Sequence, residues 1–200
     1  MTPVTKELME AFEDRTKAHT ELVLYFAGLL HYDYPEHDHS KFHADIVGGF
    51  VLANARSKLG LTLDDEDKMV VAKAIFNHVK QEAHHPEYWD ETQTWDNFSI
   101  NPAGFKHAMD GDTVHRVDAR KMDERSMVEM CCDLCAVSHE LGDNPRRFLN
   151  ENLDKRWLFT PDQIKFMTMT IGALWQNHMQ KRGKTDQVFV VLKDGLSEAL

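Results

Sequence analysis

Apolar residues recur at helical spacings through most of this 200-residue chain, and this period constrains the fold more than any other feature. Between positions 5 and 30, residues three, four or seven positions apart form a single stripe: Leu8, Phe12, His19, Val23, Phe26 and Leu30. That spacing is typical of one face of an α-helix. Five further segments show helical patterns: residues 44–59, 62–83, 123–141, 145–154 and 160–181. The sequence therefore predicts an all-α protein, which we interpret as one domain over residues 1–200.

Proline, glycine and capping residues mark where these helices should begin and end. Pro35 breaks the segment after the first helix, and Gly60 is a suitable helix stop. Thr62 or Asp64 can cap the next helix, and Thr160 can cap the last one. Residues 90–121 show no clear period and are a candidate lid or insertion, and residues 188–200 could form a strand or a docked segment.

Composition limits the partners and the compartment. A formal net charge of −10 argues against nucleic acid as a partner, because that binding depends on basic residues that neutralise phosphates. No stretch approaches the roughly 20 apolar residues needed to cross a membrane, and the first residues are acidic where a signal peptide is basic. We therefore expect a cytoplasmic protein without a membrane partner. A homo-oligomer stays open, and so does a small phosphorylated substrate, because bound metals can supply local positive charge.

Histidine is the unusual component, with 12 residues concentrated at positions 31–43 and 78–85. Together with two aspartates, some of them form a set of candidate metal ligands: His19, His37, Asp38, His78, His84, His85 and Asp133. These are nitrogen and oxygen donors, which suit Mn, Fe, Co, Ni, Mg or Zn in an open site that also holds water. In helical bundles such sites are built from inward-facing side chains on several helices. The chain therefore has the donors for one or two divalent metal ions.

Each candidate alone also has an ordinary structural explanation. His19 could be a core histidine, and the pair His84-His85 could simply end a helix. Asp133 is harder to explain, because it shares a helix face with apolar residues and a buried carboxylate needs a cation or a donor. Glu129, one turn earlier, is expected to support a ligand or to face solvent rather than to bind a metal. The joint pattern is what favours chemistry.

That pattern, in the order H, HD, H, HH and D, resembles the HD-domain metal-dependent phosphohydrolase superfamily. The stretch His37-Asp38-His39-Ser40-Lys41 resembles its HD-x-[GS]-K signature. The strings HDHSKF, FNHVKQEAHHPEYW and EMCCD are similar to an HD-like branch found in phages and bacteria. The resemblance extends over residues 18–137, which would form the metal-site core, with C-terminal helices and a tail over residues 144–200.

The resemblance implies an HD-domain-like helical bundle that hydrolyses a phosphate ester with a metal-activated water. A first metal would have four ligands: His19, His37, Asp38 and Asp133. Asp38 would bridge to a second metal with three further ligands: His78, His84 and His85. Lys41 would contact the phosphate oxygens, so that Asp38 and Lys41 are the expected catalytic residues. His39, His43, His115 or Lys41 could protonate the leaving group.

Several alternatives stay open. The substrate could be a nucleotide, a small phosphomonoester or a phosphodiester. The first four ligands alone could hold a single metal, the same ligand order serves di-iron oxygenases, and a regulator that binds metal or nucleotide without turnover also fits. A redox role for Cys132 and Cys135 is disfavoured, because both lie in mid-helix near an acid, and buried free thiols are expected. Aromatic residues after the histidine pair, Trp89 among them, are expected to anchor the loop over the site.

Overall fold

Helices form nearly all of the regular structure in the computed structural model, which describes residues 2–98, 116–153 and 155–182. In this part of the chain there are six α-helices: α1 (Lys6–Gly28), α2 (Val47–Leu59), α3 (Asp65–Gln81), α4 (Glu124–Leu141), α5 (Pro145–Asn152) and α6 (Pro161–Lys181). Three short 3-10 helices lie between them: His39–Phe42, Pro86–Trp89 and Trp95–Asn97. The predicted all-α fold class is confirmed.

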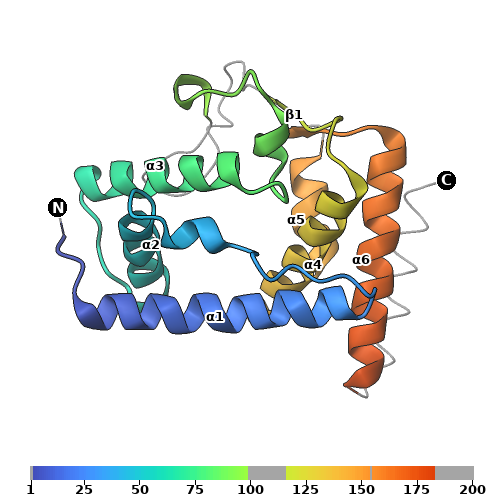
Figure 1. The fold of residues 1–200 in the computed structure, drawn as a ribbon, viewed down its shortest axis with the longest axis horizontal. Coiled ribbons are helices and arrows are strands. Elements are labelled where there is room, and N and C mark those ends of the chain that lie inside the picture. Colours follow the sequence, from blue (N-terminus) through green and yellow to red (C-terminus); the bar gives the residue numbers. More distant parts are fainter. Residues whose placement is uncertain (1, 99–115, 154, 183–200) are drawn as a thin grey trace.

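Helix α1 runs along both halves of the molecule (Figure 1). Its N-terminal half lies against α2, and its C-terminal half packs on α4 and α6, where Phe26 stacks on Trp175. Full burial of a side chain such as Phe26 stabilises the fold by about 1.5–3 kcal/mol. A smaller apolar cluster, separate from that of Phe26, joins α2 and α3 through Leu52 and Val71. The segment after α1 passes between the two halves, and this is where the histidines gather.

The helix ends follow the predicted capping residues. The side chains of Asp64 and Thr160 accept hydrogen bonds from the third backbone N–H of α3 and α6. Gly60 ends α2 in the left-handed conformation, at φ 69°. Helix α3 stops at Gln81, two residues before the predicted end, because Glu82 is already extended. This early end frees the following residues to form a turn.

A short parallel pair of strands, β1 (Val117–Asp118) and β2 (Trp157–Leu158), was not predicted. Each strand is two residues long, which is too short to produce a visible alternation in the sequence. The pair ties the residues before α4 to those before α6. The core of the predicted lid, residues 99–115, and the tail at 188–200 lie outside the described residues.

No helix in the described ranges is both long enough and apolar enough to cross a membrane.

Replacing Gly49 by Ala is expected to lower the free energy of unfolding by about 1–3 kcal/mol, as overpacking of a tight core does. A Cβ at Gly49 on α2 would lie 2.3 Å from the Cβ of Ala74 and 2.9 Å from the carbonyl oxygen of Val70 on α3. Urea denaturation measures the loss. Gly48→Ala is the control, because no atom lies within 4 Å of the added Cβ and alanine favours the helix. Equal losses in both variants would contradict this explanation.

Candidate metal centre

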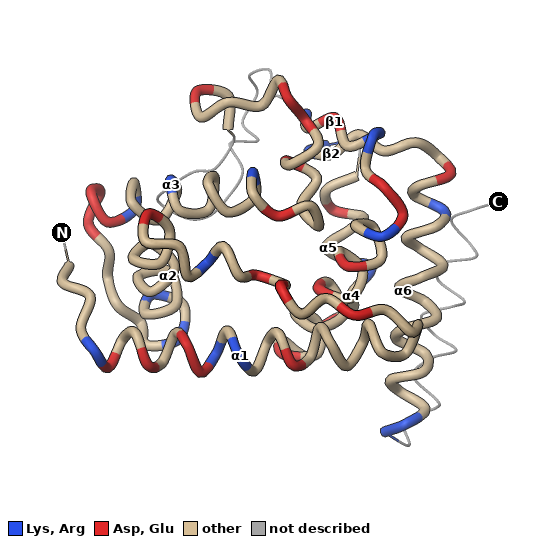
Figure 2. Tube along the Cα trace, in the orientation of Figure 1, with Lys and Arg blue, Asp and Glu red and all other residues tan. Residues whose placement is uncertain are grey.

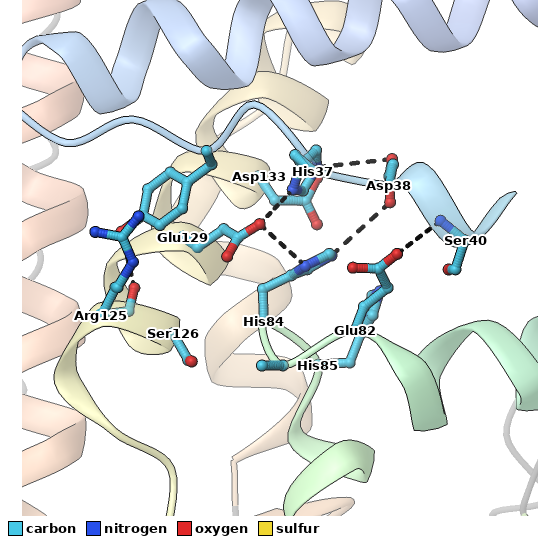
Figure 3. Close-up of polar contacts among 12 residues, drawn as sticks. His37, Asp38, Ser40, Glu82, His84, His85, Arg125, Ser126, Glu129 and Asp133 are labelled. Atoms are coloured by element: carbon cyan, nitrogen blue, oxygen red, sulfur yellow. Dashed lines mark hydrogen bonds and ion pairs between the residues drawn. The ribbon is translucent and has the colours of Figure 1, made fainter.

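The predicted ligands come together from five parts of the chain. Figure 3 shows five of these ligands: His37, Asp38, His84, His85 and Asp133. His19 lies on α1, and His37 and Asp38 lie in the segment before the first 3-10 helix. His78 lies on α3, His84 and His85 lie in the turn after α3, and Asp133 lies on α4. Seen from the sequence, they are up to 114 positions apart, between residues 19 and 133. The structure therefore places all seven of them in one cluster.

The predicted ligands divide into two groups within this cluster, and a third combination joins His37 and His84 with Glu129. In the first group, His19, His37 and Asp133 offer ligand atoms that all lie within 4.8 Å of one another. The Nε2 of His19 is 3.0 Å from Oδ1 of Asp133. This group matches three of the four ligands expected for the first metal.

The second group contains Asp38, His78, His84 and His85, again with ligand atoms within 4.8 Å of one another. The Nε2 of His78 lies 3.3 Å from Oδ1 of Asp38 and 3.0 Å from Nε2 of His85. The Nε2 of His84 lies 3.8 Å from the same carboxylate oxygen. The turn after α3 therefore brings both of its histidines to the side chain of Asp38.

Asp38 lies between the two groups and faces both. Its Oδ2 is 3.7 Å from Nε2 of His19 and 3.6 Å from Nε2 of His37, whereas Oδ1 faces His78 and His84. Its backbone is left-handed, at φ 63° and ψ 12°, a conformation that aspartate tolerates better than most residues. Such backbone conformations concentrate at functional sites. One oxygen for each group is the arrangement that a bridging carboxylate requires.

The Nδ1 atoms of His19, His37 and His78, which point away from the centre, contact two acids and a hydroxyl. Nδ1 of His19 is 2.8 Å from Oε1 of Glu140, and Nδ1 of His37 is 2.9 Å from Oε1 of Glu129. Burial raises the pKa of Glu129, but the hydrogen bond from His37 and the close approach of His84 outweigh this and lower it to about 2. An ionised carboxylate can only accept, so Nδ1 of His37 is the donor of this hydrogen bond, and its Nε2 is left to face the centre.

The same arrangement extends to the second group. The Oγ of Ser40 is 2.7 Å from Nδ1 of His78, and the backbone N–H of Ser40 donates to Glu82. Nδ1 of His84 lies 3.3 Å from Oε1 of Glu129, so this one acid supports a histidine in each group. Partners of this kind orient metal-binding histidines and raise their basicity.

Sequence reasoning identified Glu129 as a possible support but did not find Glu140 or Ser40. Glu129 precedes Asp133 by four residues and Glu140 follows it by seven, so all three lie on one face of α4. That spacing was the available signal for Glu140. Ser40 stands in the HD-x-[GS]-K resemblance, but its contact with His78 could not be predicted, because it depends on how the 3-10 helix packs on α3.

The centre is rich in negative charge. Figure 2 shows acidic positions on both the 31–38 segment and α4, which lie side by side. Burial raises the pKa of Asp38, but Lys41 and His37 outweigh it and hold that pKa well below its usual range. Nζ of Lys41 lies 2.5 Å from Oδ2 of Asp38. Burial likewise lowers the pKa of His19, but hydrogen bonds to Asp133 and Glu140 raise it to about 9. A proton and an ammonium thus balance the acids.

The residues present fit divalent metal ions. The Nε2 atoms of His37 and His84 are buried without a hydrogen-bond partner among the described residues. A buried polar atom without a partner is costly, and a metal ion would satisfy it. A divalent cation could also replace the charge that the proton on His19 supplies. The donor set of imidazoles and carboxylates agrees with this assignment.

The turn that carries His84 and His85 is held by a second polar network. The buried carboxylate of Glu87 accepts from Nε1 of Trp157 at 3.1 Å and pairs with Arg156 at 2.5 Å. Nζ of Lys80 donates to the carbonyl oxygens of Glu87 and Asp90. Trp89 donates from Nε1 to a backbone carbonyl of the turn and packs against the larger core cluster, as an anchor of this loop should. The histidines therefore project from a fixed support.

The three cysteines take no part in the centre. Cys131, Cys132 and Cys135 are buried free thiols, as predicted. Burial and the nearby charge of Glu129 raise the pKa of Cys132 to about 12. A thiol in this state is a poor nucleophile and a poor metal ligand.

The candidate proton donors differ in position. The side chain of His39 is 65% exposed, and His43 contacts Gln81 at the surface. His115 lies outside the described residues. Lys41, whose side chain is 19% exposed, is the candidate that touches the cluster.

Comparison with known proteins yields one match. The profile of DUF5662, described as a family of unknown function, matches residues 8–173, which include every residue of the centre. Neither the curated proteins nor the solved structures contain a significant match.

Replacing Glu129 by Gln is expected to weaken divalent metal binding by about 10–100-fold, because the amide cannot hold two imidazoles in the orientation that the carboxylate enforces. Competition with a chelating dye for Co²⁺ measures the affinity. Glu36→Gln is the matched control, since Glu36 precedes His37 but its side chain is 82% exposed. An affinity equal to that of the wild type in Glu129→Gln would exclude this supporting role.

Proposed function

Since this chain belongs to the DUF5662 family of unknown function, we propose its activity from the site itself: a metal-dependent phosphohydrolase with an HD-like centre for two divalent ions. The observation that carries the proposal is the orientation of the histidines. In His19, His37 and His78 a polar partner holds Nδ1, and Nε2 faces the carboxylates of the centre. Core histidines without a ligand have no reason to share this orientation.

Each group has a defined role in this proposal. His19, His37 and Asp133 would hold one ion, His78, His84 and His85 would hold the other, and Asp38 would contact both. Divalent metals bound there would polarise a phosphoryl group and lower the pKa of a water from about 15.7 toward neutrality. The protein keeps the ligands buried and their rings fixed, so little reorganisation is needed when the substrate binds.

Lys41 supplies the mobile positive charge of the site. Its ammonium pairs with Asp38 and lies 5.2 Å from the centre of the Phe50 ring. If bound metal balanced the charge of Asp38, the ammonium would be available to a phosphate oxygen or to a leaving group. The flexible stem of lysine allows this change of partner without movement of the backbone.

Metal analysis of the protein purified without chelator tests the centre. We expect about two divalent ions per chain in the wild type, as in binuclear hydrolases. Asp38→Asn should lose both, because asparagine keeps the left-handed backbone but removes the bridging charge. His19→Gln and His85→Gln should each lose about one, from different groups. A wild type that stays free of metal after reconstitution with Mn²⁺ would rule out the proposal, and iron-specific loading with dioxygen consumption would support the oxygenase alternative.

Replacing Lys41 by Met should lower kcat/KM for phosphate ester hydrolysis by about 100-fold, the typical cost of losing one group that stabilises the transition state. Metal content should be retained, because removal of the ammonium leaves Asp38 more available to cations. Steady-state kinetics and metal analysis of the same preparation separate the two effects. A loss of metal in this variant would show that Lys41 supports the centre rather than the reaction.

A further inference from the structure

A pocket of about 400 Å³ opens directly beside the candidate metal centre. Its inner end is lined by Asp133, His84 and His85, with ligands of both groups among them. This volume lies within the range of small-molecule sites, about 300–1,000 Å³. A molecule in the pocket would therefore have one end at the metals and the rest of its body between α3, α4 and α5.

The walls of the pocket are largely apolar. They are formed by side chains of α3, α4 and α5, among them Ile75, Val79, Met130, Leu134 and Phe148. The apolar lining continues to the surface, where Val137, Leu141 and Phe148 are 36%, 65% and 46% exposed. Such side chains gain free energy when an apolar group covers them. The pocket is thus suited to an apolar body.

The basic side chains of the pocket wall already face acids. Arg147 pairs with Asp143 and lies 3.7 Å from Glu151. Arg156 pairs with the buried carboxylate of Glu87. A second phosphate would compete with these acids for the two guanidinium groups, and at Arg156 it would weaken the pairing of the buried carboxylate of Glu87. The charges of the wall therefore disfavour a polyphosphate.

We propose that this pocket holds the organic part of a phosphate monoester substrate. The alcohol of that ester is apolar, with an aryl or a branched alkyl group. The inference rests on the phosphohydrolase function proposed above and adds the substrate class. Water attacks phosphorus, and the bond from phosphorus to the ester oxygen breaks with its electron pair on that oxygen. The oxygen takes up the proton that water loses, so the products are the apolar alcohol and inorganic phosphate.

Binding of unreactive phosphonates to the metal-loaded protein tests the pocket without turnover. (1-Naphthyl)methylphosphonate should bind at least about tenfold more tightly than methylphosphonate by calorimetry, as burial of a group larger than one methylene implies. Val137→Trp, which fills the pocket mouth, should abolish this advantage. Met169→Trp is the matched control, because Met169 is a 64% exposed residue of α6 outside the pocket. Equal affinity of the two phosphonates in the wild type would overturn the inference.

Hydrolysis of esters with similar leaving groups separates failure of the pocket from failure of the centre. The wild type should hydrolyse 2-(1-naphthyl)ethyl phosphate with a kcat/KM at least about tenfold above that for ethyl phosphate, and also above those for AMP and ATP. Hydrolysis without this preference, or a preference for ATP, overturns the substrate class and leaves the phosphohydrolase proposal intact. Binding of the naphthyl phosphonate without hydrolysis of any ester overturns the phosphohydrolase proposal itself.

Discussion

The buried carboxylate of Asp38 is the constraint on which the rest of the centre depends. It is 2% exposed, and a charge in such a position is tolerated only with cations or donors around it. Lys41 and His37 meet this need from the same segment as Asp38, whereas His19, His78 and His84 come from α1, α3 and the turn after α3. The packing of α1, α3 and α4 around the segment after α1 can therefore be understood as the enclosure of one acid.

Helix α4 serves two functions with opposite faces. Glu129, Asp133 and Glu140 line the centre, whereas Cys131 and Cys135 are buried in the larger apolar cluster.

The close approach of α2 and α3 at Gly49 positions a ligand of the second group, because Phe50 then packs edge-on against His78 at 5.1 Å. Apolar packing restricts the ring of His78, and the hydroxyl of Ser40 then contacts its Nδ1 and completes its orientation.

The environment of the centre is asymmetric, and this asymmetry would orient the proposed substrate. Acids and imidazoles surround the candidate ligands, and the pocket between α3, α4 and α5 opens from His84, His85 and Asp133 onto a largely apolar wall. A phosphate group would be drawn to the ionic side when metals are bound, and its apolar ester group to the pocket. Membership of a family of unknown function leaves both assignments to be tested on the chain itself.

The sequence by itself determined the six α-helices of the described ranges and, to within a few residues, their ends, because apolar period, capping residues and glycine act over a few neighbouring positions. It also identified seven donors, since their residue types are unusual in number and order. Only the tertiary structure decided which donors lie together in one group, that Asp38 faces both groups, and that Glu140 and Ser40 contact the rings of His19 and His78. The paired strands, the network around Glu87 and the apolar pocket were equally beyond reach. The physical reason is that these features join residues far apart in the chain, and their distances are set by packing rather than by local preference.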